Sequence, residues 1–177
     1  MRHESHEAFY ERLKGYGLKR SALCTSYAMA ENVFAVTQGG IDGPVIVDEI
    51  DREEMQVNRL ANPAHEGRPS VKMPSAGKAI QGTSVRVLDE HHKDVPDRVI
   101  GELALQSDCM LSEYYHRPDA TAKALFDGWY LTGDYGYMVG EEVFVCGRKK
   151  EIIIVGGKNV YPMDLEEIAM TVDGVHA

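Results

Sequence analysis

Hydrophobic and polar positions alternate over several short stretches of the chain, and this period of two predicts half-buried β-strands. The two clearest cases are Ser84–Asp89 and Gly101–Gln106. The polar run from Asp89 to Pro96 lies between them and predicts a hairpin connection. The other predicted strands are Leu23–Tyr27, Asn32–Gln38, Pro44–Ile50, Trp129–Thr132, Tyr137–Val139, Val143–Cys146 and Glu151–Val155.

Helical spacing is confined to short segments. Residues from Ser5 to Lys14 predict a helix with Ser5 as its N-cap. Pro118–Phe126, with Asp119 as a possible cap, and Met163–Thr171, which follows a first-turn proline, are the other two predicted helices.

One long segment shows neither period. Asp51–Ser75 is polar and carries three of the seven prolines. It predicts a mostly surface segment with one short helix near Arg52–Val57. Many short strands and few helices predict a mixed α+β, β-rich fold, built as a small antiparallel sheet or distorted β-barrel with a few short helices.

Composition narrows the function classes. A length of 177 residues fits one domain, or one domain with part of another. The net charge of -9 argues against nucleic acid as the main partner. No apolar run approaches the roughly 20 residues that span a bilayer, and residues 1–7 lack the apolar stretch expected of a signal peptide. Three scattered cysteines in apolar runs predict buried, reduced thiols and a cytoplasmic protein: Cys24, Cys109 and Cys146.

Candidate chemistry begins with Tyr27 and Glu31, four residues apart between two apolar runs. The aromatic ring could stack on a base, and the carboxylate could hold a metal-bound phosphate. The plain alternative is a core tyrosine beside a surface glutamate.

Two further segments offer polar groups to an anionic or sugar ligand. Asp134 follows Thr132-Gly133, and an ionised carboxylate is an acceptor that matches the two hydroxyls of a ribose. Arg148 lies in a cationic turn and can donate to ribose or phosphate oxygens in a fixed fork. A simple Gly-Asp turn and a solvated hairpin turn are the alternatives. The turn Gly156-Gly157-Lys158-Asn159 leaves room for close backbone approach.

Taken in order, these segments resemble the adenylate-forming acyl ligase superfamily, which comprises acyl-CoA synthetases, fatty acyl-AMP ligases, nonribosomal adenylation domains and luciferases. The resemblance runs through nearly the whole chain. Its elements are Tyr27-x-x-x-Glu31, Gly101-Glu102-Leu103, Gly128-Trp129-x-x-Thr132-Gly133-Asp134 and Gly147-Arg148-Lys149-Lys150, with Gly77–Gly82 and Tyr114–Thr121 as supporting segments.

The resemblance implies roles for these residues. Tyr27 would lie on adenine, Glu31 would hold the Mg²⁺ that bridges the ATP phosphates, Asp134 would bind the ribose hydroxyls, and Arg148 would bind ribose or phosphate oxygens. Lys150 would be the hinge about which a following domain rotates, and the Gly156–Asn159 loop would then approach a thiol acceptor. Ala30 stands where many members carry a threonine that contacts phosphate, although fatty acyl-AMP ligases often have alanine there.

The resemblance also implies an activity. The parent protein would use ATP to convert a small carboxylate, expected to be a fatty acid, to an acyl adenylate, and would pass it to CoA or to the phosphopantetheine of an acyl carrier protein. The segment from Phe126 to Trp129 is too short for the insertion of many fatty acyl-AMP ligases, which leaves CoA ligation open.

Two elements that the resemblance requires have no match: the upstream phosphate loop and the distal catalytic lysine. Residues 1–147 are therefore expected to be the C-terminal part of the large domain, and residues 148–177 the hinge and the start of the small domain. The chain alone is expected to be inactive. The alternatives are an AMP-binding module without catalysis and a fragment that self-associates through exposed subdomain surface.

Overall fold

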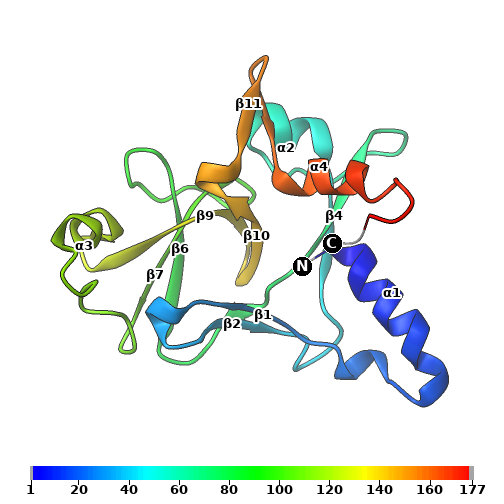
Figure 1. The fold of residues 1–177 in the computed structure, drawn as a ribbon, viewed down its shortest axis with the longest axis horizontal. Coiled ribbons are helices and arrows are strands. Elements are labelled where there is room, and N and C mark those ends of the chain that lie inside the picture. The colour runs from blue at the N-terminus through cyan, green and yellow to red at the C-terminus, as the bar shows by residue number, and fades with distance from the viewer. Residues whose placement is uncertain (1, 176–177) are drawn as a thin grey trace.

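A computed structural model describes residues 2–175. The chain is a β-rich α+β fold in which antiparallel strands curl around a shared core, which confirms the predicted fold class (Figure 1). The strands are β1 (Thr25–Ala28), β2 (Ala35–Gly39), β3 (Val47–Asp51), β4 (Ser70–Pro74), β5 (Lys78–Ala79), β6 (Thr83–Leu88), β7 (Gly101–Ser107), β8 (Leu125–Phe126), β9 (Trp129–Val139), β10 (Glu142–Arg148), β11 (Ile153–Val155) and β12 (Lys158–Val160). The helices are α1 (His3–Leu13), α2 (Arg52–Asn58), α3 (Pro118–Ala124) and α4 (Pro162–Ala169), with short 3₁₀ turns η1 (Lys14–Tyr16), η2 (Arg20–Ala22), η3 (Ala30–Asn32) and η4 (Lys149–Glu151).

The main sheet has the order β10-β9-β7-β6, and β8 pairs with β9. The predicted β6–β7 hairpin is confirmed, since the two strands pair antiparallel along their length. The strands expected at Trp129–Thr132 and Tyr137–Val139 are one strand, β9. Its ladder with β7 jumps from the pair Glu102 and Tyr135 to the pair Ala104 and Leu131. This jump is a bulge, and it hides the continuity of β9 from the sequence pattern.

A three-stranded sheet, β1-β2-β5, lies beside the main sheet (Figure 1). The strand expected at Asn32–Gln38 begins later, at Ala35, because Ala30–Asn32 form the turn η3 between β1 and β2. Asn32 stabilises this turn: its buried side chain donates to the carbonyl oxygen of Ala35 at 2.8 Å.

The Asp51–Ser75 segment is not the surface segment that its polarity predicts. It contains the expected helix, α2, but also strand β4, which pairs with β3. Met55, Ala61 and Met73 of this segment are buried in the main core. Asp51 begins the helix, because its carboxylate accepts the backbone N–H groups of Glu53 and Glu54 at 2.9 and 3.0 Å.

Two predicted helix caps are wrong. Helix α1 begins at His3 with Arg2 in the N-cap position, so Ser5 lies inside its first turn. Helix α3 has Arg117 as its N-cap, without a side-chain cap, and Asp119 instead pairs with the guanidinium of Arg117 at 3.1 Å. The first-turn proline of α4 is confirmed.

The segment after Arg148 packs on the rest of the chain. Strands β11 and β12 form a hairpin whose turn is Gly156-Gly157, both with positive φ. Asn159 is buried and donates to the carbonyl oxygen of Gln56 in α2 at 2.8 Å. Tyr161 is fully buried in the main core, and Asp164 of α4 accepts from Arg52 of α2 at 3.1 Å. The domain boundary expected after residue 147 stays a prediction.

The three cysteines are free thiols, but two of them are not buried as predicted. Cys24 is exposed because Leu23 and Thr25 on either side of it face inward. Cys109 lies exposed in the turn after β7, and Cys146 is buried in β10.

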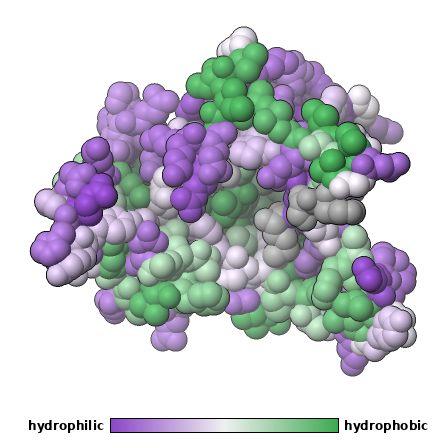
Figure 2. Space-filling model, in the orientation of Figure 1, coloured by the Kyte–Doolittle hydropathy of each residue, from purple (hydrophilic) through white to green (hydrophobic). Residues whose placement is uncertain are grey.

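Hydrophobic side chains gather on the surface over the β11–β12 hairpin (Figure 2). Ile153, Ile154 and Val155 are 50%, 67% and 61% exposed. Within residues 2–175, none of the helices combines the length and the apolar character that crossing a bilayer would require.

Candidate functional site

The bulge in β9 forms the centre of the candidate site. Thr132, Gly133 and Asp134 lie opposite the single β7 residue Leu103, so they leave the regular ladder. Gly133 adopts a φ of 71°, which glycine tolerates without the strain of a side chain. The hydroxyl of Thr132 donates to the carbonyl oxygen of Leu103 at 2.8 Å and accepts the N–H of Asp134 at 3.0 Å. These bonds fix the direction of the Asp134 side chain.

Asp134 meets two of the other predicted residues. The hydroxyl of Tyr27 in β1 donates to one Asp134 oxygen at 2.5 Å, and Nε of Arg148 lies 3.2 Å from the other. Arg148 arrives there because it is the direct partner of Asp134 in the β9–β10 ladder. Burial, and then the hydrogen bond to Asp134, raise the pKa of Tyr27, so its hydroxyl stays a donor at neutral pH. The structure therefore brings Tyr27, Asp134 and Arg148 into one cluster.

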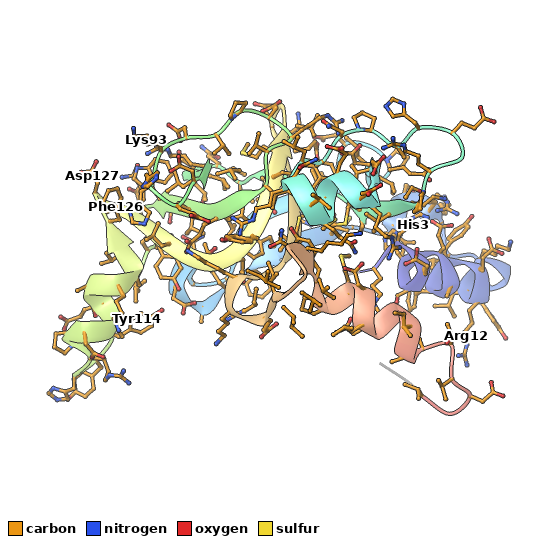
Figure 3. The ribbon with its side chains drawn as sticks, turned by 90° about the horizontal axis from the view of Figure 1, so that it is seen from above. His3, Arg12, Lys93, Tyr114, Phe126 and Asp127 are labelled. Carbon is orange, nitrogen blue, oxygen red and sulfur yellow. The ribbon has the colours of Figure 1, made fainter. Side chains whose placement is uncertain are left out.

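Glu31 in η3 is held by two tyrosines. The hydroxyl of Tyr114 donates to Oε1 of Glu31 at 2.8 Å, and the hydroxyls of Tyr114 and Tyr130 share a hydrogen bond of 3.0 Å. Tyr130 is buried in β9, and Tyr114 lies at the end of the molecule that carries α3, far from His3 and Arg12 of α1 (Figure 3). The carboxylate is thus fixed from two separate elements.

The two groups of residues share one electrostatic environment. Desolvation raises the pKa of Glu31, but the hydrogen bonds from Tyr114, the backbone and Tyr130, together with the charge of Arg148, outweigh it and lower the pKa. Glu31 is therefore an anion at neutral pH and lies within the field of Arg148. A carboxylate has about four lone-pair sites, so the bond from Tyr114 leaves Glu31 able to accept a cation.

The remaining predicted residues take less distinctive positions. Ala30 is exposed at the first position of η3, next to Glu31. Lys150 is exposed in η4, and its role as a pivot is untested. Gly156 and Gly157 lie at the exposed tip of the hairpin, whereas Asn159 points into the protein toward α2.

Four residues of the site were not predicted: Tyr114, Tyr130, Glu102 and Lys149. Each lies inside one of the motifs that carry the family resemblance, but nothing in the sequence shows that its side chain points toward the site. Glu102 looks like the outward polar position of an alternating strand, yet it is only 8% exposed. Its oxygens accept the N–H of Gly133 at 3.1 Å and the ammonium of Lys149 at 2.8 Å.

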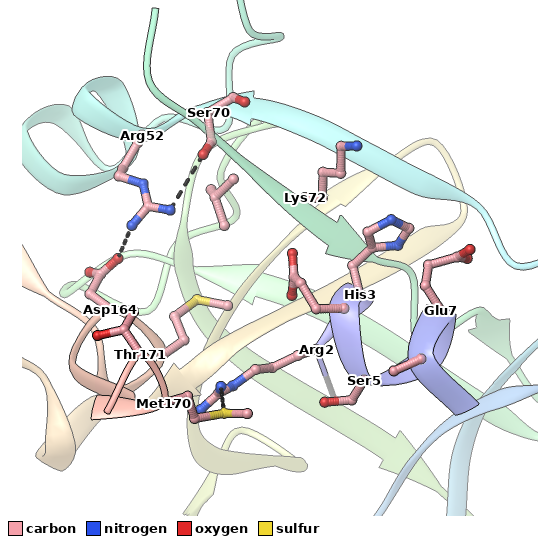
Figure 4. A pocket seen from close by; sticks show the side chains of 14 residues that line it. Arg2, His3, Ser5, Glu7, Arg52, Ser70, Lys72, Asp164, Met170 and Thr171 are labelled. Carbon is pink, nitrogen blue, oxygen red and sulfur yellow. Dashed lines mark hydrogen bonds and ion pairs between the residues drawn. The ribbon is translucent and has the colours of Figure 1, made fainter. Parts of the chain in front are cut away.

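A groove of about 800 Å³ lies elsewhere, between α1, β4 and α4 (Figure 4). Arg52 crosses it to contact Asp164 and the carbonyl oxygen of Ser70, and Arg2 reaches Met170. None of the predicted site residues is among its lining residues. The candidate site is therefore an open cluster around the β9 bulge, and the groove is a separate feature.

Comparison with known proteins shows which class of enzyme the chain resembles. No protein-family model matches the chain. The chain is 36% identical, over 92% of its length, to a protein of Mycobacterium tuberculosis whose name places it among the ligases. It is 30% identical, over 91% of its length, to a long-chain-fatty-acid–AMP ligase of Mycobacterium marinum. A solved structure from work on fatty acyl-adenylate ligases of E. coli and L. pneumophila covers 100% of the chain with a TM-score of 0.92 and 28% identity.

The chain belongs to the adenylate-forming acyl ligase superfamily. It spans 30% and 29% of the two relatives and 32% of the solved chain.

Proposed function

We propose that the chain is part of an ATP-dependent ligase that activates a carboxylate, most simply a fatty acid, as an acyl adenylate. The observation that supports this is the meeting of Tyr27, Asp134 and Arg148 around one buried carboxylate, with Glu31 in the same field. In the proposal, Asp134 accepts the ribose hydroxyls, Arg148 donates to ribose or phosphate oxygens, and the Tyr27 ring packs on adenine, next to Ala30.

Magnesium fits the donor set. One fixed, ionised carboxylate beside a nucleotide is the usual protein contribution to a Mg²⁺–phosphate site, and Glu31 is such a carboxylate. The ion would offset negative charge on the ATP phosphates when bound. The chain's own part is to keep Glu31 ionised and in place through Tyr114 and Tyr130.

The acyl group would then pass to a thiol of CoA or of a carrier-protein phosphopantetheine, with Lys150 as the pivot of the following domain. We propose that the chain alone binds the nucleotide without completing the reaction. Pyrophosphate release with ATP, Mg²⁺ and a panel of fatty acids tests this, and robust turnover by the chain would contradict it.

Nucleotide binding can be measured on the chain itself. Calorimetry at millimolar AMP is expected to show binding to the wild type and a large loss in Asp134→Ala, because the acceptor for the ribose hydroxyls is gone. Asp119→Ala is the matched control, since it removes an exposed carboxylate of α3 that pairs with Arg117. Equal heats for all three proteins, or none at all, would count against the nucleotide site.

A second candidate function rests on the exposed side chains of the β11–β12 hairpin, Ile153, Ile154 and Val155. Three consecutive exposed β-branched residues on a two-stranded sheet can pair with a second copy of the chain. Light scattering across a concentration series tests this, and a monomer at every concentration would exclude it.

A further inference from the structure

We propose that Glu102 is the positioning residue of the nucleotide site: its two oxygens fasten the turn that carries Asp134 to the segment that carries Arg148. This inference deepens the proposed function and rests on it for the identity of the ligand. It is carried by the geometry of the β9 bulge, which exists whatever ligand binds there.

The backbone of the β9 bulge lacks regular partners in β7. Three residues of β9 lie opposite one residue of β7, so their N–H groups lose regular ladder partners. An N–H that is shielded from water without a partner is costly, and two of these three groups have a side-chain acceptor. Asp134 finds the hydroxyl of Thr132 at 3.0 Å, and Gly133 finds Oε1 of Glu102 at 3.1 Å. Glu102 thus completes the turn that directs Asp134.

The segment that carries Arg148 is joined to Glu102 through the next residue, Lys149. Oε2 of Glu102 accepts Nζ of Lys149, the next residue after Arg148, at 2.8 Å. The hydrogen bond to Glu102 outweighs desolvation and raises the pKa of Lys149, so the ammonium remains charged. Its Nζ also lies 5.9 Å from the centre of the Tyr135 ring, which follows Asp134 in β9. Lys149 is therefore held by β7 and by β9 together.

One carboxylate consequently links both halves of the site. Glu102 is 8% exposed and lies in β7, an interior strand of the main sheet, which is a rigid place from which to hold two neighbouring segments. Without it, Gly133 would lose its acceptor and Lys149 its anion. Asp134 and Arg148 would then keep their own contact of 3.2 Å, and Thr132 would keep its bond to Leu103, but the contacts of Glu102 that join both segments to β7 would be lost.

Amide hydrogen exchange on the chain measures this support. In Glu102→Ala, the Gly133 amide is expected to exchange about tenfold faster than in the wild type, relative to the amides of β7, because a hydrogen bond to a charged acceptor is lost. Glu102→Gln keeps an acceptor for Gly133 and loses the charge that holds Lys149. Faster exchange in that variant is therefore expected at residues 148–151 and not at Gly133.

Lys149 provides the complementary variants. Lys149→Gln should raise exchange at residues 148–151, and Lys149→Arg should restore the wild-type rates. Glu141→Gln is the matched control, because it breaks an exposed Lys–Glu pair with Lys78 at 2.9 Å in the β9–β10 turn, and this pair includes none of Glu102, Gly133 and Lys149. Wild-type Gly133 protection in a folded Glu102→Ala, or unchanged exchange at 148–151 in Glu102→Gln and Lys149→Gln, would overturn the proposal.

The affinity for AMP supplies the functional readout. Glu102→Ala is expected to weaken AMP binding about tenfold, since misplacing a contact group by a fraction of an ångström costs binding, whereas Glu141→Gln leaves it unchanged. If the wild type binds no AMP, the proposed nucleotide function of the chain fails, while the exchange rates still decide whether Glu102 holds the turn. An AMP affinity unchanged in a folded Glu102→Ala would also contradict the proposal.

Discussion

Tyr161 offers a sharp test of the packing between the main core and the segment after Arg148. Its side chain is fully buried among Ile50, Met55 and Tyr135, and its hydroxyl makes no hydrogen bond within the described part of the chain. A buried hydroxyl without a partner costs about 1–3 kcal/mol relative to a satisfied one. Tyr161→Phe removes that oxygen and keeps the ring, so the variant is expected to be more stable than the wild type.

The expected gain is about 1 kcal/mol, which in a chain of this size corresponds to a rise of roughly 2–4 °C in Tm. Tyr161→Ala removes the ring as well and should lose about 3–5 kcal/mol through the cavity that it leaves. Urea unfolding, followed by fluorescence and circular dichroism, gives the midpoint and the m value for each variant.

Tyr137 is the matched control in the same cluster. It too is fully buried, but its hydroxyl donates to Asp48 at 3.1 Å. Tyr137→Phe removes a hydrogen bond to a charged acceptor and should cost about 1.5–3 kcal/mol, the opposite sign to Tyr161→Phe. If Tyr161→Phe is destabilised as much as Tyr137→Phe at an unchanged m value, the Tyr161 hydroxyl has a partner and the reasoning is refuted.

Three further predictions concern the backbone, pH and thiols. Gly77→Ala should destabilise the chain by more than about 2 kcal/mol, because a Cβ there would lie 2.0 Å from a backbone carbon of Gln38. Gly82 has a similar φ and open space around it, so Gly82→Ala should cost about 1 kcal/mol. Equal urea midpoints for the two variants would contradict this prediction. The helix-capping hydrogen bond from Glu54 N–H, countered in part by desolvation and helped by Arg68, lowers the pKa of Asp51. The stabilisation by ionised Asp51 is therefore complete above the ordinary aspartate pKa of about 3.9 and is lost as pH falls through the lower pKa of the folded state. The difference in unfolding free energy between the wild type and Asp51→Ala should shrink in acid. A difference that stays constant down to that pH would refute the prediction. A thiol reagent at neutral pH should label Cys24 and Cys109 quickly and Cys146 after unfolding, because burial raises the pKa of the Cys146 thiol to about 12; rapid labelling of a third thiol in the native chain would show that β10 opens.

Local sequence patterns predict those helices and strands whose boundaries are set by residues close to them in the sequence. The β6–β7 hairpin follows from two alternating stretches joined by a polar turn, and both features act within a few residues. The short helix expected near Arg52–Val57 is α2, and the structure adds that Asp51 caps it. Ser5 fails as a cap because the chain already turns helical at His3, and the N-cap residue Arg2 makes no side-chain capping bond that the sequence could reveal.

Burial that depends on distant partners is harder to predict. Met73 lies in a polar, proline-containing segment, yet β4 is drawn into the core by its pairing with β3 more than twenty residues earlier. Cys24 directly precedes β1 and faces outward, because Leu23 and Thr25 on either side of it are buried. In both cases, the neighbours in space decide the environment, and a local window of sequence does not contain them.

The candidate site also depends on contacts between segments that are distant in the sequence. Family resemblance identifies Tyr27, Asp134 and Arg148 as members of one site, but their meeting depends on the register of β9 against β7 and β10. The bulge at Thr132–Asp134 breaks the alternation of β9, so the sequence pattern predicts two strands where one exists. At that break Asp134 leaves the ladder with β7 and contacts Tyr27, while it stays paired with Arg148 in the ladder with β10, and buried Glu102 accepts the backbone N–H of Gly133. A local rule fails here because the chain uses the irregularity to build the site, and the position of the failure along the sequence points to the function.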